Sequence, residues 1–550
     1  MRNVSFRNPN SWIMLIFIAG ISYLLSLQLL LADGVFFSGD SGLKALITQN
    51  LAGGYHAFDL NLSDPPWVVD LWKVGLYPYD RPFVYPIEDK YYSQYPIPFP
   101  LVTAPFYALW GYYGLYVVPW AATIVTWLIF YWVLKKIDVA LAAIVIGLFF
   151  LIFASHLSLY SATYWEHTLS VCLAFGGIGL IFPKNGSAKL NIWAALWAGI
   201  LTGLAVWFRP EQIFVVLFLG VISLFSFMKA VWRLDVLQRI NIGRMPDYIG
   251  KTGLVFIAAS LITLLLYGFI NWLIYKNVFG VHAIQVLEHQ PLRERVFTFI
   301  DNLQAMTVGR YSFFLATPIS LFTFGLPLIT LLWRRSIKHQ PDWILWVVFS
   351  LAFILGVAVL VPESAGGKQW GPRFLLMLVP VIVLLFTRQM DFLLKSPFAS
   401  NNWFRLMLMG IVIILAVVGI YQNPIRGREF LISNTAPIKE MVEDLRSVKT
   451  GAIGVSNAYL TQLYQPAVSR EVNFLLIPEE YELALFTRVL NEQNQDSFRF
   501  LCYSYACEFF DPAVASKRVA IDEDAFILHI RKIRDYERFR ILNIRIEESE

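Results

Sequence analysis

The chain has 550 residues, of which 57% are hydrophobic, 16% are aromatic and only 15% are charged. Soluble domains carry about 25% charged residues, so this composition, with a mean hydropathy of +0.57, excludes an ordinary soluble protein and predicts a polytopic membrane protein. The net charge of +5 does not favour a nucleic-acid partner, three cysteines exclude a disulfide-dense scaffold, and no Cys/His cluster has zinc-ligand spacing.

The first apolar segment, residues 11–31, follows Arg2 and Arg7. A secretory signal peptide is the competing interpretation, but its apolar core would span about 7–15 residues and end at a small-residue cleavage site. This segment is longer, and "LLLADGVFF" has no clear A-x-A pattern. We therefore predict a retained first span with the N-terminus in the cytoplasm.

Basic residues follow the spans that are expected to return to the cytoplasm. A span needs about 20 apolar residues, and cytoplasmic loops collect Lys and Arg. Lys135 and Lys136, the basic stretch 229–251 and the segment "WRRSIKH" each follow such a span. The predicted spans cover 11–31, 114–134, 139–157, 166–182, 191–208, 211–228, 252–275, 312–333, 343–361, 372–387 and 403–421. The segment 32–113 and the C-terminus then lie outside.

The last part of the chain is more polar than the rest. Strand-like runs such as "GAIGVSNA", "RFLCYSY", "FILHIRKI" and "RFRILNIRI" accompany "IKEMVEDLRSVK" and "EYELALFTRVLNEQN", which have helical spacing. This pattern predicts a small α/β domain. We expect two domains: an all-α polytopic membrane domain of about 11 transmembrane helices in residues 1–421, and an extracytoplasmic α/β domain in residues 422–550.

Ionisable residues gather in the five loops that this layout places outside. Charged groups are costly in hydrocarbon, so those at span ends need an explanation. Outer loops are also polar because they are wet, but this alternative does not explain why Glu166, Arg209 and Arg373 stand at the ends of apolar spans. The group includes Asp40 in the first loop, His156, Glu166 and His167 in the second, Arg209 and Glu211 in the third, His282, Glu288, His289 and Arg310 in the fourth, and Glu363, Lys368 and Arg373 in the fifth.

Four stretches occur in a characteristic order: an aspartate just after the first span, "YPIPFPLVTAPFYALWG", an "RPE" turn and a "GPRFLLMLVP" span start. Over residues 11–390 this order resembles the GT-C glycosyltransferases, membrane enzymes that use polyprenyl-phosphate sugars. The closest similarity is to the protein mannosyltransferase and aminoarabinose transferase branch. The resemblance implies a GT-C-like fold with outer juxtamembrane helices, a general base at Asp40, and a lipid phosphate held by Arg373 and Arg209.

Two features depart from the family pattern. The first family motif usually carries two acids, whereas "GDSG" carries only Asp40. Glu166 is the candidate for a second catalytic acid. The C-terminal domain matches no particular subfamily, so the resemblance assigns it no role.

Asp40 has two interpretations that are able to coexist. It precedes "SGLKALITQNL", in which Leu43, Leu46, Ile47 and Leu51 fall on one face, as in a helix lying on a membrane surface. Aspartate is a favoured N-cap, worth about 1 kcal/mol. As a general base, its carboxylate would take the proton from an acceptor hydroxyl that attacks the anomeric carbon, an effect of about 10²–10⁴-fold.

The candidates for phosphate binding are Arg373, Lys368, Arg209, His167 and Arg310. Arg373 follows Gly371 and Pro372 at a span start, where a helix N-terminus adds a favourable dipole; the alternative is an arginine that snorkels to the interface. Lys368 is equally well explained as a wet loop lysine. Arg209 and Glu211 are compatible with a local ion pair that shapes the turn. Glu166 and His167 open a span, where an acid is favourable for dipole reasons alone.

No cofactor or metal is expected, because cationic side chains suffice for a monophosphate lipid donor. A divalent cation stays an open alternative, and a His/Asp site would be needed for a pyrophosphate donor. The tryptophans and the stretch "YYSQYPIPFP" fit an interfacial aromatic belt. Cys502 and Cys507 face an oxidising side on this topology, which leaves both a disulfide and two free thiols open.

The function that these observations predict is an inverting glycosyltransferase of the cytoplasmic (inner) membrane. It would move a hexose or pentose from a polyprenyl-phosphate donor to an extracytoplasmic glycan, lipid or protein, so its partners are the donor, the acceptor and membrane lipids. The alternative is a polytopic transporter or lipid-linked-glycan flippase without transferase activity. Transporters place ionisable groups near the bilayer midplane, whereas here they crowd one face. A scaffold that only presents the C-terminal domain leaves this face unexplained.

Overall fold

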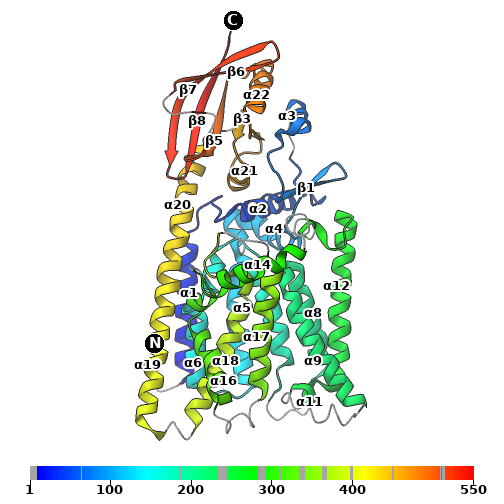
Figure 1. Ribbon diagram of the computed structural model, residues 1–550, viewed down its shortest axis with the longest axis vertical. Helices are drawn as coiled ribbons and strands as arrows, with labels where there is room; N and C mark the ends of the chain where they lie inside the picture. Colours follow the sequence, from blue (N-terminus) through cyan, green and yellow to red (C-terminus); the bar gives the residue numbers. More distant parts are fainter. Residues whose placement is uncertain are drawn as a thin grey trace. The chain divides into compact units, whose positions relative to one another are not determined.

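The computed structural model describes residues 9–549 with gaps at 63–64, 185–188, 233–244, 283, 285–291, 310–311, 333–340, 362–367, 397–399, 449–450, 508–509 and 511–513. The chain forms two compact units (Figure 1). The helical unit consists of Met1–Leu29 and Tyr116–Phe430, and the mixed unit of Leu30–Leu115 and Leu431–Glu550. The expected division into 1–421 and 422–550 differs from this one, because it joined the segment 32–113 to the spans and not to the C-terminal residues.

Long apolar helices that run alongside one another make up the helical unit (Figure 1). Every predicted span overlaps one of them, since an uninterrupted apolar run can satisfy its backbone in lipid only as a helix. They are α1 (Pro9–Gln28), α5 (Val117–Lys136), α6 (Leu141–Phe153), α7 (His167–Ile181), α8 (Ile192–Phe208), α9 (Ile213–Trp232), α12 (Gly253–Tyr275), α16 (Ile319–Leu332), α17 (Pro341–Leu360), α18 (Leu378–Lys395) and α19 (Asn402–Ile420), with α11 (Met245–Ile249), α14 (Leu292–Thr307) and α15 (Phe313–Ala316) between them.

Five helical stretches among the described residues are long and apolar enough to cross a membrane. They are Ser11–Gln28, Pro98–Lys136, Pro210–Trp232, Met245–Tyr275 and Asn402–Leu445. The helices α6, α7 and α8 and residues 344–360 are apolar but shorter. The structure thus confirms a mostly helical chain with membrane-length helices, while the full number of spans stays a prediction.

Small residues let neighbouring helices of this unit approach closely. A Cβ on Gly199 of α8 would lie 2.5 Å from the carbonyl oxygen of Phe256 in α12. Such a distance is too short for any residue but glycine. Lipid tails are as apolar as the side chains of these helices, so there is no hydrophobic driving force for helix association. Close backbone packing of this kind is therefore a main source of helix–helix affinity in membranes.

The C-terminal part of the mixed unit is a six-stranded sheet in the order β4-β3-β5-β8-β7-β6. β3 is parallel to β4 and β5, and the remaining neighbours are antiparallel. The predicted α/β domain is confirmed: the four strand-like runs became β3, β5, β7 and β8, whereas β4 and β6 were not predicted. The elements are β3 (Gly451–Val455), α21 (Ala458–Tyr464), β4 (Val472–Leu476), α22 (Glu480–Glu492), β5 (Ser497–Tyr503), β6 (Ser516–Ile521), β7 (Asp524–Tyr536) and β8 (Phe539–Glu548), preceded by α20 (Arg428–Leu445).

Residues from the segment 30–115 complete both hydrophobic cores of this domain. Val68 and Leu71 pack in the core that contains Phe486 of α22. Val35 packs in the core that contains Met441 of α20 and Leu460 of α21. This shared burial is the physical reason why the segment belongs to the mixed unit, and composition alone does not reveal it.

The segment 30–115 also forms structure of its own. It contains α2 (Gly39–Ala52), α3 (Pro66–Leu71), the antiparallel hairpin β1 (Val84–Ile87) and β2 (Lys90–Ser93), and α4 (Pro98–Trp110). The apolar face of α2 was expected to rest on a membrane surface. That expectation is wrong, because Leu43, Leu46, Ile47 and Leu51 are buried against residues of this same segment, including Tyr77, Tyr79, Val84, Tyr95 and Ala104.

Cys502 and Cys507 are joined by a disulfide. Cys502 belongs to β5, and the bond closes the turn that follows this strand. Of the two alternatives that the sequence left open, the bonded one is therefore present. Cys172 is a buried free cysteine in α7.

Candidate active site

Asp40 lies in the first turn of α2 but is not its N-cap. The helix begins at Gly39, and the capping position is occupied by Ser38, which has an extended backbone (φ −149°, ψ 161°). The N–H groups of Ser41 and Gly42 donate to the carbonyl oxygen of Ser38. The interpretation of Asp40 as a cap is therefore wrong by position. A carboxylate in the first turn still gains from the helix dipole, by about 0.3–1 kcal/mol.

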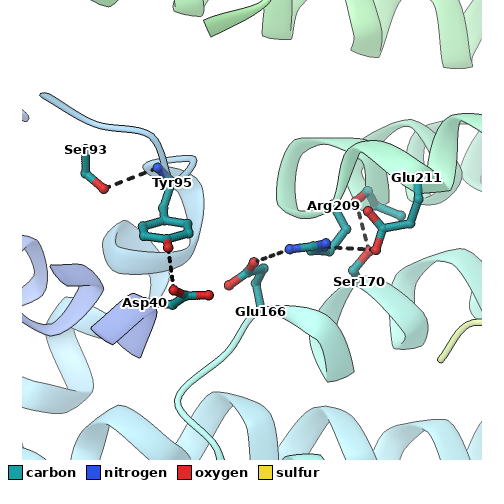
Figure 2. A network of polar contacts seen from close by, with 8 residues as sticks. Asp40, Ser93, Tyr95, Glu166, Ser170, Arg209 and Glu211 are labelled. Carbon is teal, nitrogen blue, oxygen red and sulfur yellow. Dashed lines mark hydrogen bonds and ion pairs between the residues drawn. The ribbon is translucent and has the colours of Figure 1, made fainter. Parts of the chain in front are cut away.

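The carboxylate of Asp40 is held by a tyrosine from the stretch before α4. The Tyr95 hydroxyl donates a hydrogen bond of 2.5 Å to Asp40 Oδ1 (Figure 2). The backbone N–H of Tyr95 donates to Ser93 Oγ at 3.2 Å, which ties the tyrosine to the end of the β2 strand (Figure 2). Tyr95 is buried and Asp40 is half-buried. The carboxylate is thus oriented by a protein hydroxyl while it keeps part of its surface exposed.

A buried lysine completes this cluster. Lys44 stands one turn after Asp40 in α2, and its side chain is almost fully buried. Its Nζ lies 4.5 Å from the centroid of the Tyr95 ring, a cation–π contact. Asp40, Lys44 and Tyr95 therefore bring a carboxylate, an ammonium group and a phenol together within the mixed unit.

In the helical unit, Arg209 joins two carboxylates. It follows α8, and its Nη1 lies 3.0 Å from Glu166 Oε1 while its Nε lies 2.9 Å from Glu211 Oε1 (Figure 2). The side chains are 11%, 2% and 6% exposed, so all three are largely removed from water. Burial would lower the pKa of Arg209, but the charges of Glu211 and Glu166 hold it above its usual value. Two carboxylates against one guanidinium leave this triad with an excess of negative charge.

This triad changes the interpretation of two predicted residues. Glu166 directly precedes α7, yet its side chain makes no cap hydrogen bond to that helix and pairs with Arg209. The predicted ion pair of Arg209 with Glu211 is present, but with Glu166 as a second partner. Because Arg209 already pairs with two carboxylates, its guanidinium has little uncompensated charge with which to attract a phosphate. A carboxylate that is buried and paired with an arginine, as Glu166 is, is a weak proton acceptor.

Arg373 lies close to the same triad, among aromatic rings. It opens a short 3-10 turn, Arg373–Leu375, and its backbone N–H donates to Gln369 Oε1 at 2.9 Å. Its guanidinium carbon lies 4.9 Å from the Trp165 ring centroid and 5.2 Å from that of Phe374. The guanidinium of Arg209 lies 5.0 Å from the centroid of Phe374. Two arginines thus share one phenylalanine ring.

His167 contacts the same group of rings. Its imidazole centroid lies 5.6 Å from that of Trp165 and 6.4 Å from that of Phe374, both edge-to-face. The helical unit therefore brings together four predicted site residues, Glu166, His167, Arg209 and Arg373, within one aromatic cluster.

The turn that carries Arg373 is fixed by its neighbours. Gly371 has a positive φ of 68°, and a Cβ there would lie 2.8 Å from the ring of His156. The Tyr160 hydroxyl donates to the carbonyl oxygen of Gly371 at 3.2 Å. Burial raises the pKa of Tyr160, although Arg373 and Arg209 act in the opposite direction, so its hydroxyl stays a hydrogen-bond donor. The ring of His156 and the hydroxyl of Tyr160 therefore both hold the backbone just before Arg373 in place.

The structure gives less information on two predicted phosphate-binding residues, Lys368 and Arg310. Lys368 is half-buried and lies in the described turn just before Gln369. Arg310 lies outside the described residues, as do Glu288, His289 and Glu363. Among the residues that the structure describes, no group of three or more His, Cys, Asp and Glu is arranged to hold a metal ion, so the question of a metal stays untested.

The fold as a whole is similar to that of a solved aminoarabinose transferase. ArnT from Cupriavidus metallidurans, an aminoarabinose transferase bound to undecaprenyl phosphate, superposes with a TM-score of 0.56 at 11% identity, covering 97% of this chain and 98% of that one. The chain has a GT-C fold. The apo structure of the same ArnT gives a TM-score of 0.53 at 11% identity over the same shares of the two chains.

A further GT-C structure is more distant. An oligosaccharyltransferase from Archaeoglobus fulgidus, tethered to an acceptor peptide, gives a TM-score of 0.48 at 14% identity over 89% of this chain and 69% of that one. No protein-family model and no curated protein sequence matches the chain. The resemblance that the order of the motifs indicated is confirmed at the level of the GT-C fold. An overall sequence identity of 11% would not by itself reveal this similarity of fold.

Sequence reasoning missed Tyr95 and Lys44. Tyr95 was grouped with an aromatic belt, because "YYSQYPIPFP" offers many similar rings. Lys44 was not singled out, because only the apolar residues of "SGLKALITQNL" were considered. The i, i+4 spacing of Asp40 and Lys44 places the two on one helix face and was a signal for the second residue. No local signal identifies Tyr95, which is 55 residues from Asp40.

Proposed function

We propose that the chain is a membrane glycosyltransferase that moves a sugar from a polyprenyl-phosphate donor to an extracytoplasmic acceptor, with inversion. The observation that carries this proposal is the Asp40 carboxylate, held by the Tyr95 hydroxyl in the first turn of α2. The fold adds support, because a chain of similar fold over nearly its whole length is an aminoarabinose transferase with bound undecaprenyl phosphate.

The proposed reaction is a single displacement. The acceptor hydroxyl oxygen attacks the anomeric carbon from the side opposite the phosphate, and the bond between that carbon and the phosphate oxygen breaks. Polyprenyl phosphate leaves with the electron pair, and the hydroxyl proton passes to Asp40. A positioned carboxylate contributes about 10²–10⁴-fold to such a step. The hydrogen bond from Tyr95 holds the carboxylate in the orientation for proton transfer.

Arg373 is the residue to which we assign the donor phosphate. Its guanidinium lies over the Trp165 ring, which limits its motion, and the planar fork of N–H groups of an arginine matches the geometry of a phosphate. Lys368, His167 and Arg310 remain secondary candidates for this role. We assign Arg209, which already bonds two carboxylates, to the support of the aromatic cluster in place of direct phosphate binding.

The proposal includes an orientation in the cytoplasmic membrane. The N-terminus and the loop 229–251 would be cytoplasmic, and the C-terminal domain extracytoplasmic, because the basic loops mark the inner side. Reporter fusions after Glu550 and within residues 233–244 test this. Signals from opposite sides of the membrane are expected, and signals from the same side would overturn the layout.

Transfer itself is tested with purified protein in lipid nanodiscs. The probes are undecaprenyl-phosphate hexoses and pentoses, offered with membrane extracts as the acceptor source. Protein-dependent release of undecaprenyl phosphate, with the sugar recovered on an acceptor, is the expected result. A flippase would instead move the intact lipid across vesicle membranes, and that movement without any cleavage of the sugar would contradict the proposal.

A further inference from the structure

The helix that carries Asp40 makes direct backbone contact with the C-terminal domain. A Cβ on Gly42 of α2 would lie 1.7 Å from the carbonyl oxygen of Gln462 in α21. A Cβ on Gly39 would lie 2.4 Å from Gln462 Oε1 and 2.8 Å from the Tyr459 ring. The two glycines flank Asp40 in the first turn of α2. Any larger residue at position 42 forces one of the two helices to move.

Hydrogen bonds continue this contact toward the other end of α2. Gln49 Nε2 donates to the carbonyl oxygen of Pro466 at 2.8 Å, in the turn that follows α21. Arg470 Nη2 donates to Asn50 Oδ1 at 2.6 Å, and Asn50 Nδ2 donates to the carbonyl oxygen of Leu60 at 2.8 Å. The segment 458–470 therefore contacts α2 along its whole length.

An adjacent face of α2 is buried as well. Leu43, Leu46 and Ile47 pack in the core that also contains Tyr95. α2 thus packs against α21 on one face and against the Tyr95 segment on the adjacent face. The position of the Asp40 carboxylate relative to Tyr95 therefore depends on how closely α21 approaches α2.

We propose that α21 is a positioning element for Asp40, acting through the main chain of Gln462, against which Gly42 packs. This inference rests on the proposed function, in which Asp40 is the general base. It gives the C-terminal domain a role in the chemistry: that domain fixes the catalytic helix. A misplacement of about 1 Å at a reacting group can lower a rate by about 10²-fold.

The first test compares the same substitution at Gly42, inside α2, and at Gly53, the residue that directly follows this helix. Gly42→Ala places a methyl group against the main chain of Gln462, so kcat for transfer from an undecaprenyl-phosphate sugar falls by about tenfold or more. The donor KM changes by less than about threefold, because binding groups are not touched. Gly53→Ala is the control. Its Cβ would meet only the carbonyl oxygens of Gln49 and Asn50 in its own helix, at 3.3 and 3.5 Å, and kcat is expected to be unchanged.

A second pair decides the matter if Gly42→Ala does not fold. In Gly39→Ala the new methyl group meets the flexible end of Gln462, whose amide atoms are buried without a hydrogen-bond partner in the part of the chain that the structure describes. The single variant loses kcat by several-fold, and adding Gln462→Ala restores part of it, because the truncation removes the 2.4 Å contact with Gln462 Oε1 while the 2.8 Å contact with the Tyr459 ring remains. A loss in Gly39→Ala that Gln462→Ala does not relieve would overturn the proposal.

Asp40→Asn, assayed in parallel, separates this inference from the function it rests on. If Asp40→Asn is inactive while a folded Gly42→Ala keeps the parent kcat, α21 does not position the base and the inference is wrong. If Asp40→Asn keeps the parent rate, the assignment of the base fails first, and the inference fails with it. Loss in both variants with an unchanged Gly53→Ala is the result that supports the inference.

Discussion

The two acidic regions of the molecule hold their carboxylates in different ways. In the helical unit, Glu166 and Glu211 are buried and share the guanidinium of Arg209. In the mixed unit, Asp40 is half-buried and accepts a hydrogen bond from the Tyr95 hydroxyl. A guanidinium can only donate, so a proton on Glu166 or Glu211 would break an ion pair. A hydroxyl can donate or accept, so the Tyr95 contact survives when Asp40 gains a proton.

This difference suits Asp40 to proton transfer, and it suits Glu166 and Glu211 to a structural role. A general base must take up and return a proton in every cycle without loss of its surroundings. Asp40 meets that requirement, whereas the triad of Arg209, Glu166 and Glu211 is most stable with all three groups charged. The triad therefore serves best as a rigid structural support for the aromatic cluster that contains Arg373.

The largest expected effect is on stability, from Arg209→Ala. This variant leaves two buried carboxylates unpaired, which costs about 3–5 kcal/mol when one partner of a buried ion pair is removed. Thermal unfolding in detergent should show a clear fall in the midpoint temperature. Arg426→Ala is the control, because its pair with Glu429 is exposed and contributes at most about 1 kcal/mol.

Replacing the whole triad sharpens this prediction. Arg209→Met combined with Glu166→Gln and Glu211→Gln removes every charge, so it should recover much of the stability that Arg209→Ala loses. A single Arg209→Ala variant as stable as the parent would show that the triad does not hold the helical unit together.

The next effect is on lipid binding, from Arg373→Ala. Loss of a charge-assisted hydrogen bond costs about 1.5–3 kcal/mol, so affinity for undecaprenyl phosphate should fall by about tenfold or more. Titration of the purified variant with undecaprenyl phosphate measures this, and the midpoint of thermal unfolding serves as the control for folding. Unchanged affinity in a folded variant would return Arg373 to the role of an interfacial arginine.

A smaller effect is expected from Tyr95→Phe. The substitution keeps the ring in its packed position over Lys44 but removes the hydrogen bond to Asp40. The carboxylate becomes less well oriented, so kcat should fall by about tenfold or less while the donor KM stays the same. Tyr113→Phe, at an exposed ring, is the matched control. Equal rates for the two variants would remove Tyr95 from the site.

The sequence predicts much of this molecule where the signal is local. Apolar runs predicted the apolar helices of the helical unit, and the spacing of "EYELALFTRVLNEQN" predicted α22, whereas α14 lies in a stretch that was predicted as a loop. The contacts that define the sites are not local. Tyr95 is 55 residues from Asp40, and Glu166 is 43 residues from Arg209. The assignment of the segment 30–115 to the C-terminal domain depends on packing between ends of the chain that no periodicity relates.

The central claim is that Asp40, and not Glu166, is the base, and one comparison tests it most directly. Transfer rates are measured in the same nanodisc preparation for Asp40→Asn and Glu166→Gln, both of which keep the size of the side chain and remove its charge. The account predicts that Asp40→Asn folds and binds undecaprenyl phosphate but loses about 100-fold or more in rate. Glu166→Gln should lose stability and keep a rate within about tenfold of the parent, because it disturbs only the ion pair with Arg209. Near-parental transfer by Asp40→Asn, with the large loss in Glu166→Gln, would contradict the claim.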